Sequence, residues 1–399
     1  MNSDLIIPPA RAHSGASVSM QGKVVLVRCE GYEEAAVYSA VQRGVDLLGG
    51  ISRFFQAGET LLLKPNVLSG KSPDRAITTH PSVFQAVARL FQEGGASLTY
   101  GDSPGFGKVE TVVQRAKLSS VAEKLGIPLA DFSEGRTVSF PEGAISKQFT
   151  IAAGVLAADG IISLPKLKTH ALTRLTGAVK NQFGCIPGLR KGEFHARMQR
   201  IDQFAAMLVD LTRMLSPRLY VMDGIVAMEG NGPGNGTPRP LNVLLFSTDP
   251  VALDAAASRI VCLDPALVPT IVKGQEQGLG TYEALELLGD PVEDFLCPDF
   301  DVNRRGDWTK DAAGRRSARL IKNLVSPRPV ILKDKCTRCG TCVKVCPIDP
   351  PAVDFLQEDK SRPPEYDYKR CIRCYCCQEM CPDSAIVVET PLLGRLIHR

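Results

Sequence analysis

The chain has 399 residues, of which 44% are hydrophobic and 23% are charged. This length predicts two or more domains, and the composition is sufficient for a sizeable core. The formal net charge of +4 is too small to indicate a nucleic-acid-binding protein. No apolar run approaches the roughly 18 residues of a membrane-spanning helix. We therefore expect no nucleic-acid partner and no transmembrane segment.

The first 22 residues contain a Pro-Pro pair and several Ser and Gly residues without a continuous apolar core. This composition is not that of a secretory signal, and we interpret residues 1–22 as a disordered leader. A reduced, cytoplasmic location is the expectation that fits this leader and the free cysteines of the chain.

Between residues 23 and 296, short apolar runs alternate with segments of helical periodicity. The runs that we predict to be strands are 23–27, 61–63, 97–100, 160–164, 219–222 and 243–246. The predicted helices are 33–48, the segment that begins at Pro81 and ends at Gly94-Gly95, 201–215, and the segment that begins at Asp249-Pro250. This alternation predicts an α/β domain over 23–296, with a mostly parallel sheet and helices on both faces.

Residues 297–332 interrupt this pattern and are rich in Arg and Lys. We interpret them as a basic, solvated linker with a short helix near 316–325. The alternative is a docking strip for an acidic redox partner, or for the acidic surface of the following domain.

Two runs of four cysteines, each followed by proline, come next in the chain. Both read C-x2-C-x2-C-x3-C-P, the spacing with which bacterial ferredoxins bind [4Fe–4S] clusters, the fourth Cys of each run ligating the other cluster. The predicted ligand sets are Cys336, Cys339, Cys342 and Cys381 for one cluster, and Cys371, Cys374, Cys377 and Cys346 for the other. Residues 333–390 thus resemble a two-cluster ferredoxin, a small α+β domain.

Zinc binding and a disulfide framework are the alternatives for these cysteines. Zinc ribbons separate two C-x2-C pairs by a longer loop, and disulfide frameworks are typical of small secreted domains. Neither fits two consecutive runs in a chain of this length. Cys376 is an additional thiol inside the second run, and we expect it to be packed rather than to act as a ligand.

Polar residues follow the predicted strands at their carboxyl ends, where open α/β sheets bind ligands. This recurrence predicts a shared cleft. The alternative is a set of structural Lys–Asp pairs without chemistry. The residues concerned include Lys64, Asn66, Asp102, Ser103, Lys166, Lys168, His170, Asp223, Glu229 and Asp249.

Clustered lysines favour an anionic ligand, and a lysine crowded by other cations, or His170, is suited to donate a proton. No G-x-G-x-x-G motif follows the first strand and no P-loop motif occurs, so a nicotinamide, flavin or nucleotide-hydrolysing site is not predicted. The glycine-rich segment 230–236 is interpreted as a flexible lid or an anion-binding backbone nest.

Seven segments, in order, resemble the DUF362 family. They are KPN (64–66), TTHP (78–81), GDSPG (101–105), LPKLKTH (164–170), TGAVKNQFGC (176–185), VMDGIVAMEGNGPGNG (221–236) and STDPVALDA (247–255). The resemblance covers about 24–296, and such domains often occur fused to, or beside, two-cluster ferredoxin modules. A more distant similarity to lactate-racemase-like proteins supports the α/β architecture only.

The motif matches imply a set of cleft residues. Lys166, Lys168, His170 and Asp102 are the expected catalytic residues. The expected substrate-binding residues are Lys64, Asn66, His80, Ser103, Lys180, Asn181, Asp223, Glu229 and Asp249.

The sequence as a whole favours an iron–sulfur oxidoreductase. Two [4Fe–4S] clusters would pass electrons, received from a soluble electron-carrier protein, to a small anionic organic substrate in the cleft. One alternative is an electron-transfer subunit that docks a partner redox protein. The other is non-redox chemistry in the cleft, with structural or sensory clusters.

Overall fold

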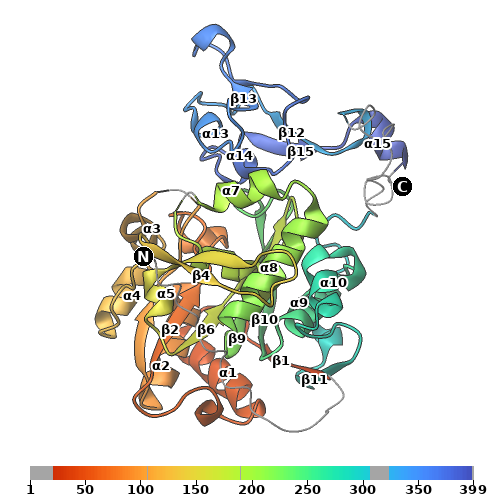
Figure 1. Ribbon diagram of the computed structural model, residues 1–399. Coiled ribbons are helices and arrows are strands. Elements are labelled where there is room, and N and C mark those ends of the chain that lie inside the picture. Colours follow the sequence, from red (N-terminus) through yellow and green to blue (C-terminus); the bar gives the residue numbers. More distant parts are fainter. Residues whose placement is uncertain (1–20, 106, 189, 306–322, 398–399) are drawn as a thin grey trace.

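The computed structural model describes residues 21–105, 107–188, 190–305 and 323–397. They form a large α/β domain and a small module, drawn in blue at the top of Figure 1. Residues 1–20, most of the predicted leader, lie outside this description. Within the described residues, no helix is long and apolar enough to cross a membrane.

A nine-stranded sheet forms the centre of the large domain. Seven of its strands follow the order β11-β1-β10-β9-β6-β2-β3, and outside this order β7 pairs with β9 and β8 pairs with β7. The pairs β11–β1, β9–β6, β6–β2 and β2–β3 are parallel, whereas β10 runs antiparallel to both of its neighbours. The prediction of a mostly parallel α/β sheet is confirmed. The strands are β1 (Gly22–Arg28), β2 (Thr60–Pro65), β3 (Ser97–Tyr100), β6 (Gly160–Leu164), β7 (Lys166–His170), β8 (Arg174–Thr176), β9 (Leu219–Glu229), β10 (Thr237–Ser247) and β11 (Leu285–Gly289).

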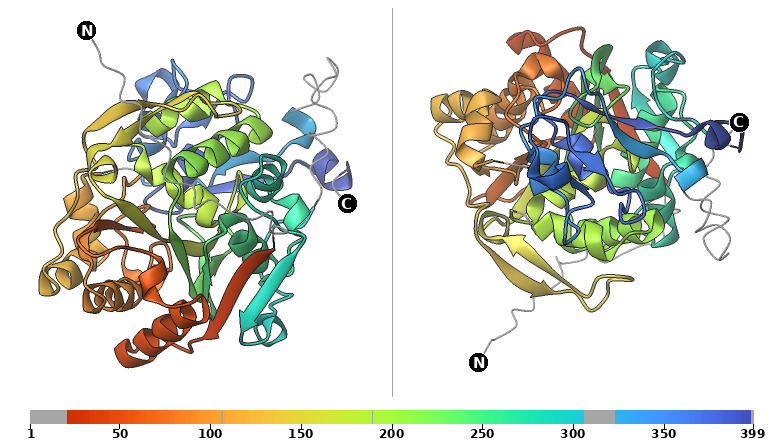
Figure 2. Two further views of the ribbon diagram at one scale, coloured as in Figure 1. Left: turned by 60° about the horizontal axis from the view of Figure 1, so that its bottom comes forward. Right: turned by 90° about the horizontal axis from the view of Figure 1, so that it is seen from above.

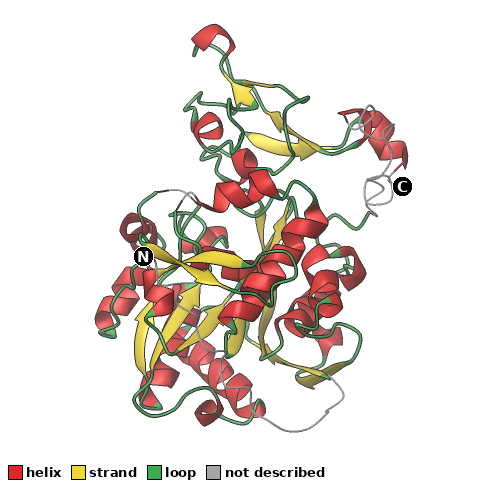
Figure 3. Cartoon of the chain, viewed as in Figure 1, coloured by secondary structure: helices red, strands yellow, loops and turns green. Residues whose placement is uncertain are grey.

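Helices cover both faces of this sheet, as Figure 3 shows. Because successive side chains of a strand point to opposite faces, Leu61 and Leu63 of β2 pack in one core and Leu62 packs in another. This burial on both faces explains why the strand reads as a continuous apolar run. The first core contains side chains of α1 (Glu34–Leu47) and α2 (Pro81–Glu93). The opposite face is covered by α8 (Ile201–Leu215), α9 (Pro250–Ile260) and α10 (Pro269–Glu276).

Shorter elements complete the large domain. They are α3 (Val109–Arg115), α4 (Leu118–Lys124), α5 (Ala153–Leu156), α6 (Ala178–Asn181), α7 (Arg190–Arg197) and the hairpin of β4 (Gly135–Ser139) with β5 (Gln148–Ala152). The domain extends beyond the predicted boundary at residue 296, because Cys297, Phe300 and Val302 pack in the core that contains α9. Most of the helix predicted near 316–325 lies outside the described residues.

The small module is built from two short antiparallel ladders and three short helices. One ladder pairs β12 (Arg328–Ile331) with β15 (Ile386–Glu389), and the other pairs β13 (Val353–Asp354) with β14 (Glu365–Tyr366). Because β12 pairs with β15 from Arg328 onward, the module begins at Arg328 rather than at the predicted residue 333. Its helices are α13 (Thr341–Lys344), α14 (Cys376–Glu379) and α15 (Leu392–Ile397).

The loop 230–236 between β9 and β10 contacts the module. The module lies over the end of the α/β domain that faces the viewer in the right-hand view of Figure 2. The side chain of Gln378 donates to Asn231 Oδ1 at 2.8 Å and to the Gly232 carbonyl at 3.1 Å. Asn235 donates to the Gln378 carbonyl at 2.8 Å and accepts from the Ser384 hydroxyl at 2.8 Å. The glycine-rich loop, interpreted from the sequence as a lid or an anion nest, is therefore a docking loop.

Replacing Gly234 with alanine should loosen this docking. A Cβ atom at this position would lie 2.8 Å from the backbone oxygen of Glu379, so the module would have to shift, at a cost of about 1–3 kcal/mol. We expect faster amide hydrogen exchange across 376–386 in Gly234→Ala. Gly31→Ala is the control, because a Cβ there meets no atom within 4 Å. Unchanged exchange in Gly234→Ala would contradict this role of the loop.

Candidate functional site

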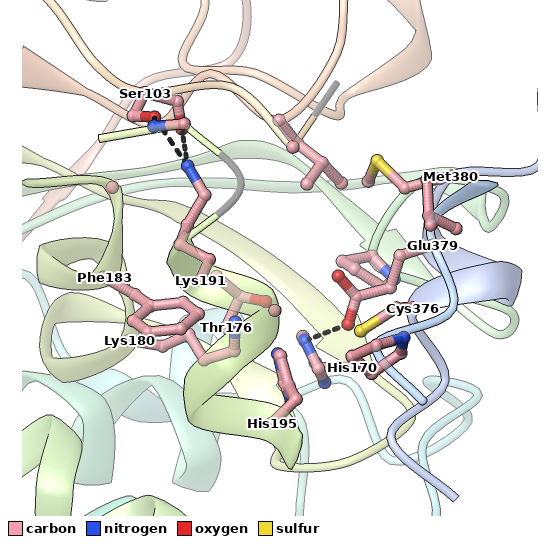
Figure 4. A pocket seen from close by; sticks show the side chains of 18 of the residues that line it. Ser103, His170, Thr176, Lys180, Phe183, Lys191, His195, Cys376, Glu379 and Met380 are labelled. Carbon is pink, nitrogen blue, oxygen red and sulfur yellow. Dashed lines mark hydrogen bonds and ion pairs between the residues drawn. The ribbon is translucent and has the colours of Figure 1, made fainter. Parts of the chain in front are cut away.

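A pocket of about 500 Å³ lies between the α/β domain and the module. The α/β domain lines this pocket with residues that follow β2 and β3 and with residues of β7, at the carboxyl ends of parallel strands. The module contributes Lys344 to Pro347, Cys376, Glu379 and Met380. Figure 4 shows Glu379 and Cys376 facing the domain's Lys180, His170 and His195.

The pocket brings together about half of the residues that the sequence predicted for the cleft. Those that line it are Asn66, Asp102, Ser103, Lys168, His170, Lys180 and Asn181. The remaining predicted residues lie beneath the pocket or away from it: Lys64, His80, Lys166, Asp223, Glu229 and Asp249.

Lys64 lies beneath the pocket and is fully buried. Its ammonium is 2.8 Å from Asp102 Oδ1 and 3.2 Å from Asn181 Oδ1. The second carboxylate oxygen of Asp102 accepts from the Val67 backbone at 2.6 Å. Gly184 permits this arrangement, since a Cβ there would lie 1.8 Å from Asp102 Oδ1. Lys64 therefore supports the floor of the pocket rather than contacting its contents.

Lys166, Asp223 and His80 form a second buried network that does not line the pocket. Lys166 Nζ lies 2.7 Å from Asp223 and donates to the Tyr32 hydroxyl at 2.9 Å, and the Tyr32 hydroxyl in turn donates to Asp223 at 2.9 Å. His80 stacks on Tyr32, and its Nδ1 accepts from the Ser82 backbone to cap α2. In this structure the predicted catalytic Lys166 is thus one half of a structural ion pair.

Glu229 and Asp249 are not part of the site either. Glu229 accepts from the Asp301 backbone at 3.0 Å, and Asp249 caps α9 by accepting from the Val251 and Ala252 backbones. Because β10 runs antiparallel to its neighbours, its carboxyl end and Asp249 lie at the opposite end of the strands from the pocket.

His170 meets a carboxylate that the module supplies. Its Nδ1 accepts from the backbones of Leu172 and Thr173 at 3.0 and 3.3 Å, so the proton of the neutral ring lies on Nε2. This atom is 2.9 Å from Glu379 Oε1, an ion-pair distance without hydrogen-bond alignment. Burial lowers the pKa of His170, and Lys180 adds to this effect.

Glu379 was not predicted, because its place depends on how the module docks. Burial by itself would raise the pKa of Glu379, but the facing His170 and the nearby Lys180 bring that pKa to about 2. The carboxylate is therefore charged, and it is the group that the module presents to the cationic wall of the pocket.

The lysines of that cationic wall are Lys168, Lys180 and Lys191. Lys168 Nζ donates to the Ile77 carbonyl at 2.7 Å, and burial lowers its pKa to about 7. Burial also lowers the pKa of Lys180, whose ammonium lies 5.4 Å from the Phe183 ring. Within the described residues no hydrogen-bond acceptor is found for the Lys180 ammonium. Lys180 is therefore the lysine most available to an anionic ligand.

Helix α7 adds two residues that the sequence analysis missed, Lys191 and His195, which lie four residues apart on one face of the helix. Lys191 donates to the Ser103 hydroxyl at 2.6 Å and to the Ser103 carbonyl at 2.8 Å, and burial lowers its pKa to about 7. The buried His195 stacks on Phe204. The i, i+4 spacing was the available signal for this pair.

The position of Lys180 depends on Asp254 of α9. The two carboxylate oxygens of Asp254 accept from the backbones of Ala178 and Val179 at 2.6 and 3.2 Å, at the start of α6. Gly177 leaves room for this approach, since a Cβ there would lie 2.0 Å from Asp254 Oδ1. The short helix that carries Lys180 and Asn181 is thus fixed from outside the pocket.

Two smaller cavities in the module are each surrounded by four cysteines. We call them the Cys339 cavity, lined by Cys336, Cys339, Cys342 and Cys381, and the Cys346 cavity, lined by Cys346, Cys371, Cys374 and Cys377. Each cavity combines three cysteines of one run with the fourth of the other. This arrangement fits four-cysteine iron–sulfur clusters with crossed ligation. Among the described residues, no group of three His, Cys, Asp or Glu side chains is arranged to hold a single ion.

Comparison with known proteins agrees with this division of the chain. Residues 61–259 match the family described as "Domain of unknown function (DUF362)", and residues 328–382 match the "4Fe-4S dicluster domain". A thylakoid-associated protein of Synechocystis sp. is 38% identical over 270 residues, which are 66% of this chain and 82% of that protein. The chain belongs to the DUF362 family. Its C-terminal module is an iron–sulfur dicluster domain.

Solved structures similar to this DUF362 protein are distant. The lactate racemase apoprotein from Thermoanaerobacterium thermosaccharolyticum has a TM-score of 0.38 and 9% identity, covering 60% of this chain and 57% of that one. A protein from Thermotoga maritima has a TM-score of 0.33 and 11% identity, covering 58% and 60%. The DUF362 chain thus spans less than two thirds of either protein.

The stability of the DUF362 domain should depend on the protonation of Lys168. Its folded pKa of about 7 lies below the ordinary value of 10.5, so between these pH values the unfolded chain binds a proton that the folded chain lacks. The free energy of unfolding should therefore rise with pH in this window, by up to ~1.4 kcal/mol per pH unit from this group.

Lys168→Met should flatten that rise without removing it, because Lys191 titrates in the same window. The measurement is denaturant unfolding of the holoprotein between pH 7 and 9.5. Lys124→Met, at an exposed position of α4, serves as the control. An equal slope in wild type and Lys168→Met would show that Lys168 titrates normally.

Proposed function

We propose that this DUF362 protein is an iron–sulfur oxidoreductase that reduces a small anionic organic substrate in the pocket between its two domains. The observation that carries the proposal is that the pocket has walls from both domains. Cationic side chains come from the DUF362 domain, and cysteine-bearing segments come from the dicluster module. A redox module and a ligand site that merely shared a chain would not need a common wall.

The pocket is suited to an anion with a polar, reducible group. The Lys180 ammonium, which has no hydrogen-bond acceptor in the described part of the chain, is available to a carboxylate, and Lys168 and Lys191 add positive charge beside it. Charge-assisted hydrogen bonds of this kind contribute about 1.5–3 kcal/mol each. A substrate carboxylate bound at Lys180 would compete with Glu379 for the same cationic wall.

Proton supply is the second function of this wall. A pKa of about 7 allows Lys168 to give a proton near neutral pH and to regain it from solvent. His170 carries its proton on Nε2, toward Glu379 and the pocket. Reduction of a conjugated double bond or a carbonyl needs two electrons and two protons. Lys168 would supply these protons, regaining one from solvent after each transfer, and the neutral His170 would donate a hydrogen bond from Nε2 rather than a proton.

The dicluster module would hold two [4Fe–4S] clusters, one in the Cys339 cavity and one in the Cys346 cavity. Such clusters supply one-electron transfer when they are bound. The electrons would come from a soluble one-electron carrier protein. A cytoplasmic location remains our expectation, although the name of the Synechocystis relative makes a location at the thylakoid surface the arrangement to test alongside it.

The test uses anaerobically prepared, reduced holoprotein and a panel of small 2-enoic and 2-oxo carboxylic acids. We expect at least one acid to reoxidise the clusters, with formation of the reduced acid. In Lys180→Ala the efficiency of this reaction should fall by a factor of about ten or more. Lys124→Ala is the matched control, because this lysine is exposed and does not line the pocket.

Other outcomes would favour other functions. Reoxidation by a protein carrier alone, with no turnover of any acid, would favour an electron-transfer subunit. Turnover that survives loss of both clusters, in the double variant Cys336→Ala/Cys371→Ala, would favour non-redox chemistry in the pocket. Either outcome would overturn the proposal.

A further inference from the structure

The two cysteine cavities differ in what surrounds them. The Cys346 cavity shares Cys346 and Pro347 with the pocket, whereas the Cys339 cavity shares no residue with it. The lining of the Cys339 cavity includes the exposed Cys339 and its exposed neighbours Thr337 and Arg338. One cavity therefore adjoins the pocket and the other adjoins solvent.

The lining of the Cys346 cavity is also less polar than that of the Cys339 cavity. Tyr375 and Arg373 are buried beside it, at 7% and 6% exposure, and the Tyr366 hydroxyl donates to Cys377 Sγ at 3.2 Å. The lining of the Cys339 cavity includes Thr337, Arg338, Thr341 and Asp383 instead. The exposed Cys339 gives a carrier protein an approach to the Cys339 cavity that does not lead through the pocket.

The segment that leads into the Cys339 cavity is basic. Lys333, Lys335 and Arg338 are all exposed, with Asp334 as the one acidic residue between them. None of the three forms an ion pair with a described residue, and Arg338 donates only to the Ser361 carbonyl, at 2.9 Å. Unpaired cations around an exposed redox site attract a partner of opposite charge and orient it.

We propose that the surface formed by residues 333–339 is the docking site for an acidic one-electron carrier protein, and that the Cys346 cavity serves the pocket. This division rests on the proposed function for its direction. Each docked carrier is oxidised by one electron, and two such events, with two protons from the pocket wall, balance the reduction of one substrate molecule.

The first test measures the difference in solvent exposure between the two clusters and requires no substrate turnover. The reduced holoprotein is titrated with a soluble gadolinium chelate, and the spin relaxation of each cluster signal is followed by electron paramagnetic resonance. Cys339→Ser and Cys374→Ser assign the two signals, either by shifting them or by removing them. We expect the signal that depends on Cys339 to relax at lower chelate concentration. Equal sensitivity, or the reverse order, would overturn the inference.

The second test concerns the partner. An acidic plant-type ferredoxin, reduced photochemically, serves as the probe, and the rate of cluster reduction is measured by stopped flow. Lys333→Glu/Lys335→Glu should lower this rate about tenfold at low salt and weaken its salt dependence. Lys124→Glu should leave it unchanged, and reduction by dithionite should be equal in all three proteins. A double variant that reacts with the ferredoxin at the wild-type rate would overturn the docking site.

These tests separate the two proposals. Asymmetric relaxation together with a charge-dependent carrier reaction would stand even if no acid were reduced, in which case the proposed function would fail alone. Reduction of an acid with symmetric relaxation would leave the proposed function intact and remove the division between the two cavities.

Discussion

Replacing Cys346 with alanine should remove the cluster that depends on Cys371, although Cys346 belongs to the first cysteine run. In the structure Cys346 lines the same cavity as Cys371, Cys374 and Cys377. A [4Fe–4S] cluster that loses one of its four thiolates loses a covalent ligand, so we expect about half of the iron and half of the charge-transfer absorbance to disappear.

Double variants give the decisive comparison. Cys346→Ala/Cys371→Ala removes two ligands of one cavity and should retain as much iron as either single variant. Cys346→Ala/Cys336→Ala removes one ligand from each cavity and should retain almost none. If ligation instead followed the order of the sequence, the second double variant would be the one that keeps half of its iron, and the crossed arrangement would be refuted.

Asp102→Ala should be the most destabilising substitution at the pocket. It leaves the fully buried Lys64 ammonium without its carboxylate partner, which lies 2.8 Å away. Removing one partner of a buried ion pair costs about 3–5 kcal/mol. The free energy of unfolding, measured by denaturant titration of the holoprotein, should fall by that amount.

An exposed ion pair provides the control for this prediction. Glu286 lies 3.2 Å from Lys23, and both side chains are partly or largely exposed. Glu286→Ala should therefore change the free energy of unfolding by no more than about 1 kcal/mol. If Asp102→Ala were equally mild, the buried ion pair would not stabilise the fold, and the account of the pocket floor would be wrong.

Most of the fold could be predicted because its signals are local. The apolar runs that became β1, β2 and β6 are buried on both sides, and Pro81 and Asp249 begin their helices as their residue types indicate. The direction of β10 could not be predicted, since an apolar run has the same composition in either direction. The sequence therefore grouped Asp249 with the cleft residues, whereas it lies at the opposite end of the strands from the pocket.

The candidate site was predictable only in part, for a related reason. Residue type and position after a strand identified Asp102, Lys168 and His170, but the same criteria also selected Lys166 and Asp223, which satisfy each other 2.7 Å apart. Whether a buried lysine faces a pocket or a carboxylate depends on side-chain packing. Glu379 had no signal of its own, because it lies between ligands of the cysteine motif and reaches His170 only through docking of the module.

The contact between Glu379 and His170 has a consequence for how such proteins can be divided. Each half of the chain holds a group that the other half needs, so neither half would have a finished pocket if the chain were split between two genes. The separated DUF362 domain would present an open cationic surface, and the separated module would present an unbalanced carboxylate. Covalent linkage guarantees one module for every pocket, whereas two unlinked polypeptides would have to find each other first, at a rate set by their concentrations.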